Sequence, residues 1–106
     1  MVEVSGVEAE IASAKIVVYS KSGCPFAGRT KEMLRAANVT FLLRELDQMN
    51  NGSDVQNKLK QISGQSTVPN IFIAGKHVGG NSEVQAAKTS GALKMMLDAA
   101  GVSNDL

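Results

Sequence analysis

The stretch Ile16-Val17-Val18-Tyr19-Ser20-Lys21-Ser22-Gly23-Cys24-Pro25-Phe26-Ala27 decides the fold of this chain. Its first four residues form an apolar, mostly β-branched run, which predicts a strand covered on both faces. Residues 20–23 predict a turn. Pro25 suits a first helical position because its fixed φ and missing N–H cost nothing there. Apolar and small residues then recur at helical spacing and predict a helix from about 25 to 37: Thr30, Met33, Leu34 and Ala37.

Before this strand–turn–helix unit, Val4, Val7 and Ile11 recur at helical spacing and predict an amphipathic helix within residues 1–14. After it, Phe41-Leu42-Leu43 and Leu46 predict a second strand. The next predicted helix begins at Ser53 or Asp54, either of which can cap it, and it ends at Gly64. Its buried face is expected to hold Val55, Leu59 and Ile62.

The last part of the chain predicts two short strands, 71–73 and 76–78, joined by a turn at Ala74-Gly75. Gly79-Gly80 breaks the second of them, and Asn81 or Ser82 is expected to cap a helix that runs to about Ala87. A final helix closes at Gly101. Its inward side chains are expected to be Leu93, Met96, Leu97 and Ala100, and the methionines Met33, Met95 and Met96 are interpreted as core. This order predicts one α/β domain over residues 1–106, with an N-terminal helix (1–14) and a core (15–102) whose mixed sheet is covered by helices.

Composition narrows the function. The chain has 106 residues, a formal net charge of +1 and 4% aromatic residues. A nucleic-acid-binding protein usually has a basic excess, so we expect no nucleic-acid partner. No apolar run approaches the roughly 18 residues that cross a membrane, so we expect no membrane association. The first 15 residues lack a basic segment and carry Glu3, Glu8 and Glu10, unlike a signal peptide, so we expect a cytoplasmic protein.

The single cysteine, Cys24, is the candidate for chemistry. One thiol cannot form an internal disulfide and is too few for a structural zinc site, so no metal site is predicted. A lone cysteine is either a buried small hydrophobe or a reactive thiolate. Cys24 stands at the predicted start of a helix, where unpaired N–H groups and the helix dipole favour a negative sulfur. Lys21 and Arg29 lie near it in sequence and can add positive potential. This context favours the reactive thiolate.

Three motifs in this order resemble the glutaredoxin family: Lys21-Ser22-Gly23-Cys24-Pro25-Phe26-Ala27, Thr67-Val68-Pro69 and Gly79-Gly80-Asn81-Ser82-Glu83. The resemblance covers about residues 15–102. It implies a thioredoxin-like fold with a four-stranded mixed sheet in the order 2-1-3-4, whose third strand is antiparallel to the first. It also implies a glutathione-dependent thiol-disulfide oxidoreductase, with glutathione and glutathionylated proteins as partners. We expect a monomer.

The resemblance further implies roles for single residues. Cys24 matches the nucleophile and Phe26 the aromatic residue beside it. Lys21 and Gln56 match contacts to the glycine carboxylate of glutathione. The Thr67-Val68-Pro69 segment matches a loop with a cis proline, whose Val68 backbone would pair with the cysteinyl part of glutathione. A pocket for the γ-glutamyl part is implied by four matching residues: Gly80, Asn81, Ser82 and Glu83.

Two departures from the family pattern affect the mechanism. Ala27 stands where the family usually has Cys or Ser, and the sequence leaves open whether Ala27 is native or replaces a resolving cysteine. Without a resolving thiol, the expected reaction is a monothiol one: Cys24 takes glutathione from a mixed disulfide, and a second glutathione releases it. Glu83 replaces the more usual Asp.

Two alternative functions stay open at this point. Some members of the family hold a [2Fe–2S] cluster between two subunits with two glutathiones, which one cysteine per chain would allow. Pro25 argues against this alternative, because the dedicated cluster carriers usually have Gly after the cysteine. The other alternative is an inert thioredoxin-like interaction domain, in which Cys24 would be unreactive.

Overall fold

The computed structural model describes residues 6–106 and contains one four-stranded sheet in the order β2-β1-β3-β4. The strands are β1 (Ile16–Ser20), β2 (Leu42–Glu45), β3 (Asn70–Ile73) and β4 (Lys76–Gly79). β1 runs parallel to β2 and antiparallel to β3, and β4 runs antiparallel to β3. The expected thioredoxin-like sheet is therefore confirmed, including the antiparallel third strand.

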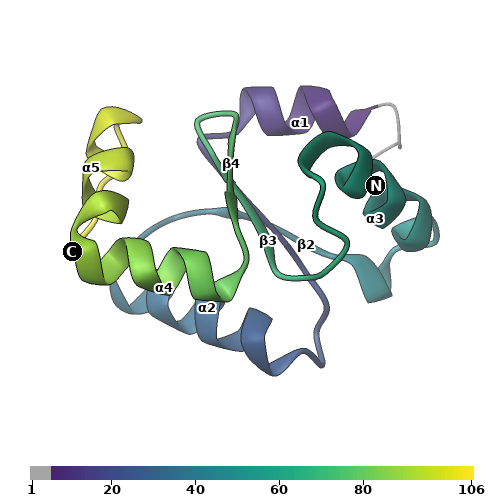
Figure 1. Ribbon diagram of the computed structural model, residues 1–106, viewed down its shortest axis with the longest axis horizontal. Coiled ribbons are helices and arrows are strands. Elements are labelled where there is room, and N and C mark those ends of the chain that lie inside the picture. The colour runs from purple at the N-terminus through teal and green to yellow at the C-terminus, as the bar shows by residue number, and fades with distance from the viewer. Residues whose placement is uncertain (1–5) are drawn as a thin grey trace.

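Helices cover both faces of this sheet (Figure 1). On one side lie α1 (Val7–Ser13) and α3 (Gly52–Ser63), and on the other lie α2 (Pro25–Ala36) and α4 (Asn81–Ser90). α5 (Ala92–Ala99) follows α4 at the end of that layer, and the 3₁₀ turn η2 (Leu46–Gln48) leads from β2 to α3. The predicted N-terminal helix exists over Val7–Ser13, whereas Val4 lies outside the described residues.

The alternation of β1 explains the two helical layers. Ile16 and Val18 belong to the apolar core beneath α2, α4 and α5, whereas Val17 and Tyr19 belong to the core beneath α1 and α3. Successive side chains of a strand point to opposite faces, so a strand without a polar face must be covered twice. All five residues of β1 are buried, as its apolar run predicts.

The first turn of α3 differs from the prediction. Neither Ser53 nor Asp54 caps this helix, which begins at Gly52 after Asn51. A Cβ on Gly52 would lie 1.9 Å from the carbonyl oxygen of Leu46, so the residue packs directly against η2 and the helix starts earlier. The close packing of Gly52 on Leu46, six residues before it, accompanies this earlier start, and the predicted capping residues play no part in it.

Two residues predicted to be buried are exposed. Ile62 on α3 is 38% exposed and Met95 on α5 is 73% exposed, whereas Met33 is buried as expected. Ile62 lies in the last turn of α3, and Met95 lies between the buried Leu93 and Leu97 on α5, so both positions fall beyond the contact with the core. Elsewhere, β2 begins at Leu42, and Leu46 belongs to η2 instead of the strand.

A polar network anchors α1 to the sheet. The buried carboxylate of Glu10 accepts a hydrogen bond from the Tyr19 hydroxyl at 2.8 Å. It also accepts two from the Arg44 guanidinium on β2, at 2.9 and 2.6 Å. We call these three residues the interior network. Over residues 6–106, no helix has the length and apolarity to cross a membrane.

Candidate active site

Cys24 is the residue directly before α2. It has an extended backbone conformation, with φ −87° and ψ 117°, and Pro25 follows as the first helical residue. Gly28 donates the first hydrogen bond of the helix, to the carbonyl of Cys24 at 3.0 Å. The amides of Phe26 and Ala27 precede that bond, so they have no acceptor within the helix and lie at its start, on the side of the thiol. The predicted position of the cysteine is confirmed.

The sulfur itself contacts a second loop. Cys24 Sγ lies 3.8 Å from the carbonyl oxygen of Val68, within reach of a weak thiol hydrogen bond. In the structure, Cys24 makes no side-chain capping bond to its own helix. The predicted N–H donation to the sulfur is therefore not present for this rotamer. The half-buried thiol lies between the start of α2 and the Val68 loop.

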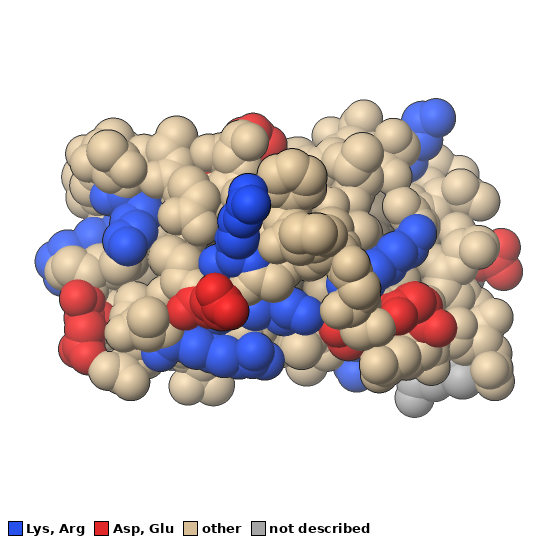
Figure 2. All heavy atoms as spheres, turned by 90° about the horizontal axis from the view of Figure 1, so that it is seen from below, with Lys and Arg blue, Asp and Glu red and all other residues tan. Residues whose placement is uncertain are grey.

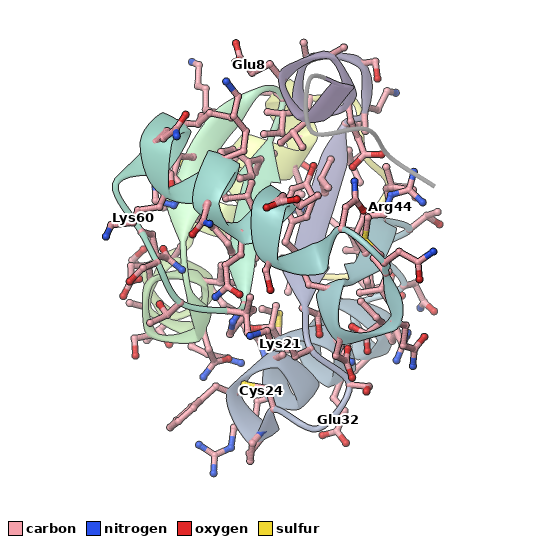
Figure 3. The ribbon with its side chains drawn as sticks, turned by 90° about the vertical axis from the view of Figure 1, so that its right-hand side faces the viewer. Glu8, Lys21, Cys24, Glu32, Arg44 and Lys60 are labelled. Atoms are coloured by element: carbon pink, nitrogen blue, oxygen red, sulfur yellow. The ribbon has the colours of Figure 1, made fainter. Side chains whose placement is uncertain are left out.

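The turn before Cys24 is held from a distant part of the chain. Asp47 in η2 accepts one hydrogen bond from the Ser22 amide at 3.0 Å and a second, short one from the Ser22 hydroxyl. These bonds and the nearby Lys21 charge hold the pKa of Asp47 below its usual range. Figure 3 places Lys21 beside Cys24 at this end of the molecule. A Cβ added at Gly23 in this turn would meet nothing within 4 Å, so no close packing requires a glycine there.

A hollow of about 310 Å³ brings most of the predicted glutathione contacts together. The residues that line it come from the start of α2, the loop before β3 and the start of α4: Phe26, Gln65, Thr67, Val68, Pro69, Gly80, Asn81, Ser82 and Glu83. Lys21, Cys24 and Gln56 do not line it. Cys24 adjoins it through the contact to Val68, and Gln56 donates its side-chain amide to the carbonyl of Ser66 at 2.8 Å. The glutathione-binding roles of these residues remain predictions.

The loop before β3 has the predicted backbone conformation. The peptide bond between Val68 and Pro69 is cis. Gln65, which the sequence analysis missed, donates its side-chain amide to the carbonyls of Thr67 at 3.0 Å and Pro69 at 2.8 Å. Its oxygen lies 3.2 Å from Nε2 of His77 on β4. Both loops of the site are thus held by side chains that reach them from outside the motifs.

The start of α4 forms the other wall of the hollow. The helix begins at Asn81 with Gly80 before it, and neither Asn81 nor Ser82 caps it with a side chain. Glu83 takes that place by accepting a hydrogen bond from the Gly80 amide at 2.8 Å. Asn81 instead accepts one at 2.9 Å from the buried Thr30 hydroxyl on α2, which links the two helices of the site. The predicted caps are therefore wrong.

The chemistry of this wall suits a zwitterion. Val84 donates the first bond of α4, to the carbonyl of Gly80, so the three preceding amides open toward the hollow. Such amides at a helix N-terminus attract a carboxylate. Glu83 adds a carboxylate that can attract an ammonium group. An α-amino-acid group, which carries both charges, would find both partners here.

Phe26 forms an exposed rim of the site. Its side chain is 55% exposed, and the Arg29 guanidinium lies 5.3 Å from the centre of its ring. Stacking of this kind holds an aromatic ring and keeps a cation close to it. Figure 2, which views the molecule from the side of α2 and α4, shows basic and acidic side chains interspersed over this face.

A larger hollow, of about 510 Å³, lies away from the cysteine. Lys15, Asn38, Thr40 and Phe41 are among its lining residues, and the loop at 101–103 closes it. It has no thiol, and Lys15 bonds to the carbonyl of Gly101 at 3.3 Å. Within residues 6–106, no three His, Cys, Asp or Glu side chains gather as metal ligands would. The thiol of Cys24 therefore adjoins the smaller hollow, through its contact with Val68.

One family model and several curated proteins match this chain in sequence. The family model described as Glutaredoxin matches residues 16–78. Glutaredoxin-C6 of Oryza sativa subsp. japonica is 46% identical over 91 residues, covering 86% of this chain and 81% of the relative. Glutaredoxin-C1 of Arabidopsis thaliana is 41% identical over 97 residues, covering 91% and 78%.

Solved structures agree as well. A buckwheat glutaredoxin–glutathione complex matches with a TM-score of 0.89 and 36% identity over 92% of this chain and 89% of that chain. The holo form of glutaredoxin C1 from Populus tremula x tremuloides matches with a TM-score of 0.88 and 33% identity, over 92% and 96%. The chain therefore belongs to the glutaredoxin family of glutathione-dependent thiol oxidoreductases.

Proposed function

We propose that this glutaredoxin reduces protein–glutathione mixed disulfides by a monothiol mechanism through Cys24. The observation that carries the proposal is the position of the thiol: it stands at the start of α2, 3.8 Å from the Val68 carbonyl and beside a hollow suited to a zwitterionic peptide. The buckwheat relative of similar fold was solved as a complex with glutathione.

The reaction consists of two exchanges. The Cys24 thiolate attacks the glutathionyl sulfur of the mixed disulfide, so a Cys24–glutathione disulfide forms and the protein thiolate leaves and takes up a proton. The thiolate of a second glutathione then attacks the glutathionyl sulfur on Cys24, forming oxidised glutathione and releasing the Cys24 thiolate. In total, one glutathione thiol enters and one protein thiol leaves, and the disulfide passes from the protein–glutathione bond to oxidised glutathione.

The binding residues would act on different parts of glutathione. The backbone of Val68 would pair with the cysteinyl residue as an added strand does. The amides that open α4 would receive the γ-glutamyl carboxylate and Glu83 its ammonium group. Lys21 would attract the glycine carboxylate. Gln56 would join it with the second N–H of its side-chain amide, since the first is donated to the Ser66 carbonyl.

Intact-mass measurement after incubation with oxidised glutathione tests the first exchange. We expect one glutathionyl group on the wild-type protein and none on Cys24→Ser, because Cys24 is the only cysteine. The second measurement is the rate at which a glutathionylated peptide is reduced by glutathione. A wild-type protein that forms no adduct, or that forms it and leaves the peptide oxidised, would overturn the proposal.

The monothiol character has its own test. Ala27 is fully buried one helical turn after Cys24, and Ala27→Cys would supply a resolving thiol. We expect this variant to expel glutathione from the adduct and form an internal disulfide, whereas the wild-type adduct persists until a second thiol arrives. A wild-type adduct that decays without added thiol would contradict the mechanism. A brown, dimeric preparation would instead support the [2Fe–2S] alternative.

A further inference from the structure

Gln65 stands at the point where three segments of the site meet. Its side-chain amide donates to the carbonyls of Thr67 and Pro69, at 3.0 and 2.8 Å. Its oxygen lies 3.2 Å from Nε2 of His77, so this nitrogen donates and the oxygen accepts. Both N–H donors of the Gln65 amide are thereby used on the loop before β3, and its oxygen accepts from β4.

The third segment is the start of α4. A Cβ added at Gly80 would lie 3.3 Å from the Pro69 carbonyl oxygen and 3.6 Å from Gln65 Nε2. The backbone at Gly80 therefore packs against the hydrogen bond between Gln65 and Pro69. Because Gly80 precedes the amides that open α4, Gln65 sets the spacing between that wall and the Val68 loop.

The hydrogen bonds of Gln65 also determine which groups of the loop remain free. The two carbonyls on either side of Val68 are occupied by Gln65, whereas the carbonyl of Val68 faces Cys24 Sγ at 3.8 Å. An added strand must find both the N–H and the C=O of one residue directed at it. With the Thr67 and Pro69 carbonyls bound to Gln65, the backbone of Val68 is left for an added strand once the weak contact between its carbonyl and the Cys24 thiol is released.

We propose that Gln65 is a positioning residue for glutathione. It contacts no reacting atom. It holds the Val68 backbone and the start of α4 at the separation that the cysteinyl and γ-glutamyl parts of one peptide require. This inference rests on the proposed function, and it adds a residue outside the three sequence motifs whose loss would weaken binding and leave the thiol intact.

The test compares variants of similar size in the glutathionylated-peptide assay. Gln65→Met keeps the length of the side chain and removes its hydrogen bonds. The two lost bonds to the Thr67 and Pro69 carbonyls, of about 0.5–1 kcal/mol each, predict that KM for the glutathionylated peptide rises about tenfold. We expect kcat to change less than twofold, because bound substrate meets the same sulfur.

Three controls separate positioning from general damage. Gln61→Met changes an exposed glutamine of α3 outside the site and should leave KM unchanged. His77→Phe keeps the ring packed on Phe72 and removes only the bond to the Gln65 oxygen, so KM should rise less than threefold. Alkylation of Cys24 by iodoacetamide, which needs no peptide pocket, should proceed at the wild-type rate in all three variants.

The outcomes are distinguishable. If wild-type protein forms a glutathione adduct but Gln65→Met keeps the wild-type KM, this inference fails and the proposed function stands. If alkylation of Gln65→Met slows as much as catalysis does, Gln65 supports the thiol itself and the inference also fails. If wild-type protein forms no adduct, the proposed function fails first. Faster amide hydrogen exchange at Val68 in Gln65→Met, with none in Gln61→Met, would support the positioning directly.

Discussion

The interior network and the side chains that hold the active-site loops use the same kinds of hydrogen bond at different depths. Glu10 and Tyr19 are buried, and with Arg44 they join α1 to two strands. Asp47 and Gln65 are exposed or half-buried, and each holds one loop beside Cys24. In Figure 3, Arg44 lies near α1, whereas Cys24 lies at the opposite end of the molecule.

Because the interior network is more buried than the contacts of Asp47 and Gln65, breaking each of them should affect a different property of the protein. A buried charge that loses its partner cannot be solvated, so breaking the interior network costs stability. An exposed side chain that loses its partner is solvated by water, so breaking a loop contact costs little stability. It does, however, release a backbone segment that must be ordered for reaction. We therefore expect changes in the interior network to alter the free energy of unfolding. Changes in the loop contacts should alter the rate of thiol–disulfide exchange at Cys24.

The largest expected effect is on the interior network. Glu10→Ala leaves the Tyr19 hydroxyl and the Arg44 guanidinium without their shared acceptor. We expect the free energy of unfolding in urea to fall by about 2 kcal/mol, because the buried Tyr19 hydroxyl loses its acceptor, whereas the Arg44 side chain is 33% exposed and stays partly solvated. The rate of thiol–disulfide exchange with the glutathionylated peptide, per folded molecule, should stay at the wild-type value.

Glu8→Ala is the matched control for this prediction. Glu8 lies on the same helix, but its bridge to Lys58 is exposed, with a side chain 64% open to solvent on the Glu8 side. Its removal should change the free energy of unfolding by less than about 1 kcal/mol. Equal losses for the two variants would contradict the distinction between buried and exposed contacts.

The second effect is a loss of stability in alkali. Burial, together with the hydrogen bond to Glu10, raises the pKa of Tyr19 far above its usual value. The folded chain therefore keeps a proton that the unfolded chain releases above about pH 10. The stability contributed by this group is complete below that pH and falls by about 1.4 kcal/mol per pH unit above it.

Urea unfolding between pH 9 and 11 measures this slope, with Tyr19→Phe as the reference. Tyr19 is the only tyrosine of the chain, so the variant removes phenol titration and keeps the lysines. We expect the wild-type protein to lose stability more steeply than the variant above pH 10. Parallel curves would show that the interior network does not hold the phenol proton.

The smallest effect is on the turn before the thiol. Asp47→Ala removes both hydrogen bonds to Ser22 and frees the turn that carries Lys21 and Cys24. We expect the exchange rate to fall about threefold, the equivalent of one modest hydrogen bond. The urea midpoint should stay unchanged.

Asp54→Ala, at an exposed position of α3, is the control for loss of one negative charge. It should leave the rate of thiol–disulfide exchange unchanged and, since Asp54 lies in the first turn of α3, lower the urea midpoint only slightly. If Asp47→Ala shifts the midpoint and leaves the rate alone, the turn belongs with the structural contacts, and the comparison between the two groups fails.

Local sequence determined the part of the site that depends on one segment. The apolar run of β1, the turn and Pro25 place Cys24 at the start of α2, because each is a property of neighbouring residues. The same reasoning located the four strands and the start of α4 to within a few residues, whereas the roles of both walls of the hollow came from the resemblance to one family. The resemblance of three motifs to one family supplied the strand order.

Only the tertiary structure decided how those segments are held together. Asp47 reaches Ser22 across 25 residues and Thr30 reaches Asn81 across 51, and neither pair leaves a periodic signal in the sequence. The predicted cap at Asn81 was wrong for the same reason, since its side chain bonds to Thr30 on α2. The predicted cap at Ser53 was wrong for a nearer one, since Gly52 packs against Leu46 six residues before it. A hydrogen bond between distant side chains depends on where the folded backbone brings them, and that is a property of the whole sheet and its helices.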